Sequence, residues 1–232
     1  MRCFCCSIII GTSEQGTVIK QDINSFSIAE EIWHAVTHGV GLLLSVAALS
    51  ILIVAAVQSG GAKGIAGALV FGIALILMYG ISTLYHALTA PMAKRILQQL
   101  DHSAVYVLIA GTYTPVTLLG VQGAFGWTLF GVEWAFAAVG IYLKAVYYGR
   151  FETLSLVLYA LMGWLIVIAA EPMFAHADAL TLSLLLAGGI TYSLGILFYV
   201  WDSLHLNHAI WHLFVLGGSV FHFFVVLFLI QG

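Results

Sequence analysis

The chain of 232 residues carries very little charge. Only 7% of its residues are Asp, Glu, Lys or Arg, whereas 62% are hydrophobic. A soluble domain has about 25% charged residues, so these few charges cannot cover a water-facing surface of this size. The net charge of −3 also provides no basic surface for DNA or RNA. The composition therefore excludes a water-soluble globule, a disordered chain and a nucleic-acid partner, and it indicates an integral membrane protein.

Cysteine is absent from the body of the chain. Cys3, Cys5 and Cys6 all lie near the N-terminus, so no disulfide framework is expected. Residues 1–24 are polar apart from residues 8–10, an apolar core too short for a signal peptide. We predict a disordered or loosely ordered segment at residues 1–26, with the role of its cysteines left open, and one domain at residues 27–232.

The chain has many apolar runs of membrane-spanning length. A transmembrane helix needs about 20 apolar residues. Runs of about this length cover residues 34–57, 64–87, 102–122, 124–147, 153–171, 179–200 and 208–230. They are apolar all round and do not alternate, which argues against a β-barrel. We therefore predict an all-α, polytopic membrane protein with seven transmembrane helices.

The lysines and arginines predict the orientation of these helices. With seven spans, the N-terminal segment and the second, fourth and sixth loops share one side of the membrane. That side carries six of the seven basic residues, and the opposite side carries only Lys63. Because Lys and Arg concentrate in cytoplasmic loops, we expect the N-terminus in the cytoplasm and the C-terminus outside.

Several histidines gather at one predicted membrane depth. His86 ends the second predicted helix, Asp101 opens the third, and His208 and His212 open the seventh. His208 and His212 are four residues apart, so they project from one helix face with a rise of about 6 Å. Ser82 and His86 have the same spacing. Three imidazoles beside a carboxylate suit a catalytic zinc ion, which takes three protein ligands and keeps a fourth position for water.

Other readings of the buried polar residues stay open at this point. A single membrane histidine more often makes an interhelical hydrogen bond than a metal bond. His34 and His38 share a face of the first predicted helix, where they either pack at the cytoplasmic mouth or belong to the site. For Glu133, midway along the fourth predicted helix, three readings are open. Its carboxyl group is protonated, or it faces a polar cavity, or the helix is shifted along the sequence.

Four motifs together carry a family resemblance. They are Ser82-x-x-x-His86, the run from Leu100-Asp101-His102 to Thr114-Pro115, the stretch from Glu30-Glu31 to Thr37-His38-Gly39, and His208-Ala209-Ile210-Trp211-His212. With them, residues 27–232 resemble the hemolysin III family, the bacterial branch of the progestin and adiponectin receptor superfamily. The resemblance implies seven helices with a cytoplasmic N-terminus, in a bacterial cytoplasmic (inner) membrane.

The resemblance also implies a zinc site. Its ligands would be His86, His208 and His212, with Ser82 and Asp101 beside the metal. Related membrane ceramidases use the same set to cleave a lipid amide, and bacterial members are linked to membrane lipid and fluidity homeostasis. We therefore expect a zinc-dependent hydrolase of a lipid amide or ester. Asp101 would be the base for a zinc-activated water, and Ser82 would donate a hydrogen bond to the oxyanion.

We also expect a particular route for the substrate, and two alternative functions stay open. A fatty-acyl substrate would enter from the bilayer, with its chain in an apolar cavity walled by residues such as Leu108, Phe198 and Phe214. One alternative is a non-enzymatic sensor of membrane fluidity with a structural zinc ion, in which Asp101 caps the third helix. The other, with less support, is a pore-forming hemolysin. The sequence identifies neither the substrate nor the oligomeric state.

Overall fold

The computed structural model describes residues 26–232, and every regular element in that range is helical. The helices are α1 (Ile28–Ala55), α2 (Gly61–Ala87), α3 (Pro91–Pro115), α4 (Gly123–Val146), α5 (Glu152–Trp164), α6 (Ala170–His176), α7 (Ala179–Tyr199) and α8 (Asn207–Gln231). Three short helical turns, η2 (Ala56–Gly60), η3 (Val116–Val121) and η4 (Leu165–Ala169), extend α1, α3 and α5. The predicted all-α class is confirmed over this range. The loosely ordered segment predicted at residues 1–26 lies outside the described residues, apart from Phe26.

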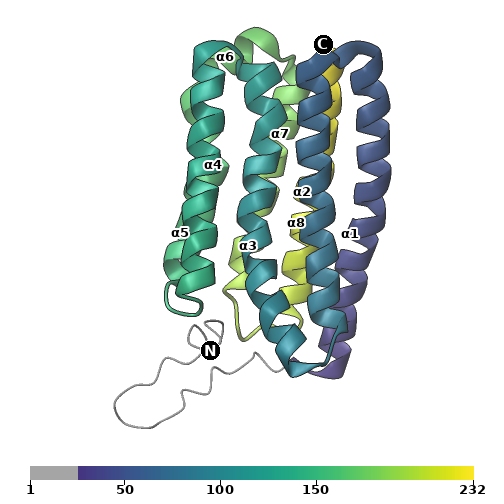
Figure 1. Cartoon of the computed structure of the whole chain (residues 1–232), viewed down its shortest axis with the longest axis vertical. Helices are drawn as coiled ribbons and strands as arrows, with labels where there is room; N and C mark the ends of the chain where they lie inside the picture. Colours follow the sequence, from purple (N-terminus) through teal and green to yellow (C-terminus); the bar gives the residue numbers. More distant parts are fainter. Residues whose placement is uncertain (1–25) are drawn as a thin grey trace, which may run out of the picture.

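Six stretches of the described chain are long and apolar enough to cross a membrane. They are Ile28–Ala87, Pro91–Val121, Gly123–Val146, Glu152–His176, Ala179–Tyr199 and Asn207–Gln231. The first stretch is 60 residues long and contains both α1 and α2, which run side by side (Figure 1). The predicted number of seven spans and the predicted orientation of the termini stay predictions.

The long helices run up and down the length of the bundle (Figure 1). Helix α2 packs between α1 and α3, α7 packs along α8, and α8 also contacts α1. As a result, α1 begins, α2 ends and α8 begins at the same end of the bundle, and the C-terminus lies at the other end (Figure 1). This topology brings residues from distant parts of the sequence to one end of the molecule.

Helix α3 begins earlier than the sequence analysis predicts. Pro91 occupies its first turn, where the missing proline N–H costs no helical hydrogen bond. Residues 94–99, four of which are polar, then form helix rather than a loop, so Asp101 lies ten residues inside α3. The prediction that Asp101 opens this helix is therefore wrong, and a role as its N-terminal cap is excluded.

Helix α4 approaches α3 closely at a glycine. A Cβ atom added to Gly140 would lie 2.3 Å from the ring of Tyr106, which is fully buried. Earlier in α4, Glu133 is also fully buried, and neither of its carboxyl oxygens has a hydrogen-bond partner among residues 26–232. Since α4 spans Gly123–Val146, Glu133 stays in mid-helix and the idea of a shifted helix is wrong.

We expect Gly140→Ala to destabilise the protein by about 1–3 kcal/mol, because the added methyl group overpacks a filled contact. The matched control is Gly131→Ala in the same helix, where a Cβ meets nothing within 4 Å and alanine favours the helix. Thermal unfolding in detergent micelles measures both. Equal midpoints for the two variants would contradict the close α3–α4 packing.

Candidate metal centre

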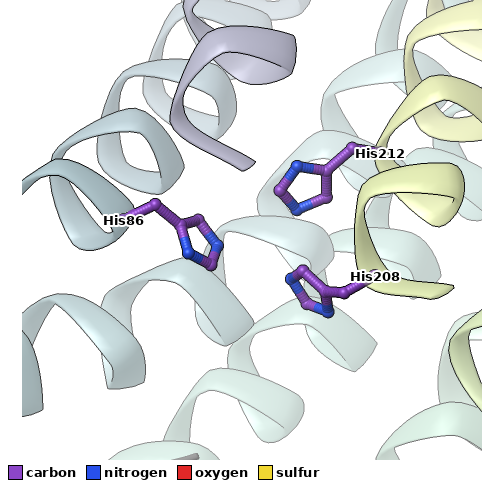
Figure 2. A group of neighbouring side chains, drawn as sticks. All are labelled: His86, His208 and His212. Atoms are coloured by element: carbon purple, nitrogen blue, oxygen red, sulfur yellow. The ribbon is translucent and has the colours of Figure 1, made fainter. Parts of the chain in front are cut away.

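Three histidines from two helices meet where α2 ends and α8 begins, and their rings point toward one another (Figure 2). The ring centroids of His86 lie 5.4 Å from His208 and 5.3 Å from His212, and the two α8 rings are 4.6 Å apart. One nitrogen of each ring lies within 4.8 Å of the others. The structure thus brings together the three predicted ligands.

The nitrogens at the centre of this cluster are buried without partners. Nε2 of His86, His208 and His212 makes no hydrogen bond within the described chain. Leaving a buried polar atom unpaired costs about 1–3 kcal/mol, so three such atoms at one point indicate a missing ligand. Imidazole nitrogens are ordinary zinc ligands, and one nitrogen of each of the three rings lies in the same buried space. The donor set therefore fits zinc.

Glu31 of α1 orients the first of these rings. Its Oε2 lies 2.7 Å from Nδ1 of His86, and because a carboxylate only accepts, the imidazole donates this hydrogen bond. Nε2 of His86 is then left with its lone pair, the form that binds a metal. Lys94 donates to the other carboxyl oxygen of Glu31 at 2.5 Å. Metal-binding histidines commonly have such a carboxylate partner.

Thr37 orients His212 in the same way. Its hydroxyl donates to the carbonyl oxygens of Trp33 and His34, so toward Nδ1 of His212, 3.1 Å away, Oγ1 acts as acceptor. Nδ1 of His212 then carries the proton and Nε2 faces the cluster with its lone pair. The sequence analysis assigned no role to Glu31 or Thr37. The signal for Glu31 is its spacing from His34 and His38, three and seven residues, which puts all three on one helix face.

His34 and His38 belong to the same cluster of rings. The ring of His34 lies 4.6 Å from His86, 4.7 Å from His208 and 5.4 Å from His212. His38 stacks on His212 with a centroid distance of 3.5 Å. Both are at most 1% exposed, and none of their nitrogens has a hydrogen-bond partner in the described range. Five imidazoles therefore share one buried space.

A second group could also hold a cation. Ligand atoms of Glu31, His34 and His86 lie within 4.8 Å of one another. However, the Glu31 carboxylate already accepts from both His86 and Lys94, so an ion there must displace the lysine ammonium. The group of three histidines carries no such competing cation, and it is the better metal site of the two.

Ser82 and Asp101 lie beside the histidines. They are 0% and 2% exposed, and the Asp101 carboxyl group lies near both the Ser82 hydroxyl and His86. Asp101 Oδ1 makes no hydrogen bond to another described residue. Since α3 carries Asp101 past its first turns, the carboxyl group is free to act on a bound molecule instead of on backbone N–H groups.

Comparison with known proteins identifies the family. The family model described as "Haemolysin-III related" matches residues 26–223, which include every histidine of the cluster. The chain belongs to this family. It is 47% identical to "Hemolysin-3" of Bacillus cereus over 182 residues, 78% of this chain and 83% of that protein. It is 48% identical to "Hemolysin-3 homolog" of Bacillus subtilis (strain 168) over 184 residues, 79% of this chain and 86% of that protein.

This haemolysin III family member also contains a large cavity that reaches the cluster. The cavity has a volume of about 770 Å³ and is lined mainly by α3, α5, α7 and α8, with Asp101 and His208 among the lining residues. Its size falls within the 300–1,000 Å³ of small-molecule sites. Leu108 lines it as predicted, but Phe198 and Phe214 do not. Their rings instead stack on each other at 4.8 Å, because α7 and α8 pack face to face.

Proposed function

We propose that this haemolysin III family protein binds zinc through His86, His208 and His212 and hydrolyses an amide or ester bond of a membrane lipid. The observation that supports this most is the convergence of three buried, unpaired Nε2 atoms beside a large cavity. A zinc ion bound there would act as a Lewis acid and lower the pKa of a water molecule toward neutrality. The three ligands leave a fourth position open.

The proposal includes a membrane topology of seven spans. The stretch Ile28–Ala87 has 60 residues, about 90 Å of helix, which is three times the thickness of a hydrocarbon core of about 30 Å. We therefore propose that α1 and α2 each cross the membrane. The excess of Lys and Arg on one side supports a cytoplasmic N-terminus. The bacterial relatives favour the bacterial cytoplasmic membrane.

Asp101 would transfer protons, and Ser82 would stabilise the developing negative charge. Asp101 has an unpaired, buried carboxyl oxygen near His86, so it can accept the proton of the attacking water and return it to the leaving group. The buried Ser82 hydroxyl can donate a hydrogen bond to the oxygen on which negative charge develops. Glu31 would keep the His86 ring in its ligating orientation throughout.

The substrate would be a lipid whose acyl chain occupies the cavity. The cavity extends from Asp101 and His208 past Leu108 to Met173 in α6. A chain in this space would hold the scissile bond near Asp101, which is how a bound substrate gains orientation for reaction. Turnover of such a lipid would link the protein to membrane lipid homeostasis.

One observation favours a second function, a non-enzymatic regulator of membrane fluidity. The His34 ring packs against all three proposed ligands, and both of its nitrogens are unpaired within residues 26–232. A fourth protein ligand from His34 would close the coordination shell, as in structural zinc sites. Zinc would then join α1, α2 and α8 without catalysis.

The first test is the zinc content of the purified protein. We expect about one zinc ion per chain in wild type from zinc-replete cells, and a loss of most of it in His208→Ala, since one of three ligands is removed. His205→Ala is the matched control, because His205 is exposed three residues away. Elemental analysis measures all three proteins. A metal-free wild type would refute the zinc proposal.

The second test concerns the carboxylate behind His86. We expect Glu31→Gln to weaken zinc binding by about 10–100-fold, the usual effect of removing a partner of a ligating histidine. Glu30→Gln is the control, because Glu30 is half-buried and completes the cap of α1 with Ser27. Competition with a chromophoric chelator measures the affinities. The same affinity in both variants would remove Glu31 from the site.

The third test separates hydrolysis from regulation. Asp101→Asn preserves the shape of the side chain but removes the base, so we expect zinc to be retained and hydrolysis to fall by about 10²–10⁴-fold. Lipidomics of cells expressing wild type or Asp101→Asn measures the effect as a difference in free fatty acid or in one amide or ester lipid. Identical lipid profiles with altered membrane fluidity would instead favour the regulator.

A further inference from the structure

A second polar cluster lines the same cavity, and the proposed chemistry does not use it. It consists of His102 on α3, Lys144 on α4 and Glu152 on α5. Nζ of Lys144 donates to Oε2 of Glu152 at 2.5 Å, and Nδ1 of His102 lies 3.8 Å from the same oxygen. The end of α4 and the start of α5 lie at the end of the bundle that holds the histidines (Figure 1).

The burial of Lys144 distinguishes this cluster from a surface ion pair. The Lys144 side chain is 4% accessible, whereas that of Glu152 is 44% accessible. A charged group within an apolar helix is rare and usually marks a functional site. A buried ammonium also needs an anionic partner, because an unpaired buried charge is strongly destabilising. Glu152, at the exposed start of α5, can turn toward water if another anion takes its place.

We infer that Lys144 and His102 bind the acidic headgroup of an amphiphile whose chain lies in the cavity. Glu152 holds the position of that acid group when no ligand is bound. The shared chemistry is an anionic oxygen group, a fatty-acid carboxylate or a lipid phosphate, because an anion is what the buried Lys144 ammonium requires. The volume of about 770 Å³ accommodates one such molecule.

In one respect the inference rests on the proposed function. A hydrolase of lipid amides or esters releases a fatty acid, and this cluster would hold the acid group of that product in the cavity that Asp101 and His208 also line. Binding needs neither turnover nor metal. Acid binding that persists in chelator-treated protein therefore tests the headgroup site independently of the zinc centre.

The experiment measures ligand binding to the full-length protein in nanodiscs of zwitterionic lipid. The probes are palmitate, lysophosphatidate and the neutral hexadecanol. We expect Lys144→Met to weaken binding of the acidic probe at least about tenfold and to leave hexadecanol binding unchanged. Arg150→Met is the matched control, because Arg150 is an exposed cation of the same α4–α5 turn that does not line the cavity. It should change neither affinity.

Glu152→Gln provides the opposite test. Because it removes the competing carboxylate, we expect it to strengthen acid binding severalfold. Palmitate binding without lysophosphatidate binding identifies a fatty-acid site, and the reverse identifies a lipid-phosphate site; either supports the inference. Acid binding by Lys144→Met equal to wild type would overturn it. So would a parallel loss of acid and alcohol binding in both variants, since the ion pair would then serve only to join α4 to α5.

Discussion

The cost of burying unpaired imidazole nitrogens is the constraint on which this end of the bundle depends. Five histidine rings share a space that water barely enters, and most of their nitrogens have no partner within residues 26–232. Such desolvation costs about 1–3 kcal/mol for each unpaired group. A fold retains this cost where a ligand offsets it. We propose a metal ion because it would pair these nitrogens. Whether its coordination shell stays open for water or is closed depends on whether His34 also binds it.

Hydrogen bonds outside the cluster decide which nitrogens face inward. Glu31 accepts from His86, and Thr37, with its own proton already donated, accepts from His212. Both rings are thereby set in the tautomer whose Nε2 carries a lone pair. Lys94 balances the charge of Glu31. Helix α1 thus supplies the orienting groups for ligands carried by α2 and α8.

The cavity connects this centre to a second polar cluster. Asp101 of α3 and His208 of α8 line it, and so do Lys144 of α4 and Glu152 of α5. An apolar interior with charged groups at one end matches an amphiphile, whose chain and headgroup need those two environments. The sequence analysis counted Lys144 only among the basic residues that predict the orientation, and it did not predict the burial of this side chain. Its depth becomes visible only when α4 packs against its neighbours.

The sequence by itself determined the class of the protein and predicted the three proposed metal ligands. Scarce charge requires a lipid environment, and the four-residue spacing of His208 and His212 puts both on one face of a helix, because these are local properties of a chain. The sequence analysis placed the start of α3 too late, at Asp101, since the preceding residues 94–99 are mostly polar and yet helical. Only the tertiary structure decided which partners orient the histidines and which residues line the cavity. Those facts depend on how α1, α3, α7 and α8 pack against one another, and that packing is set by contacts between residues far apart in the chain.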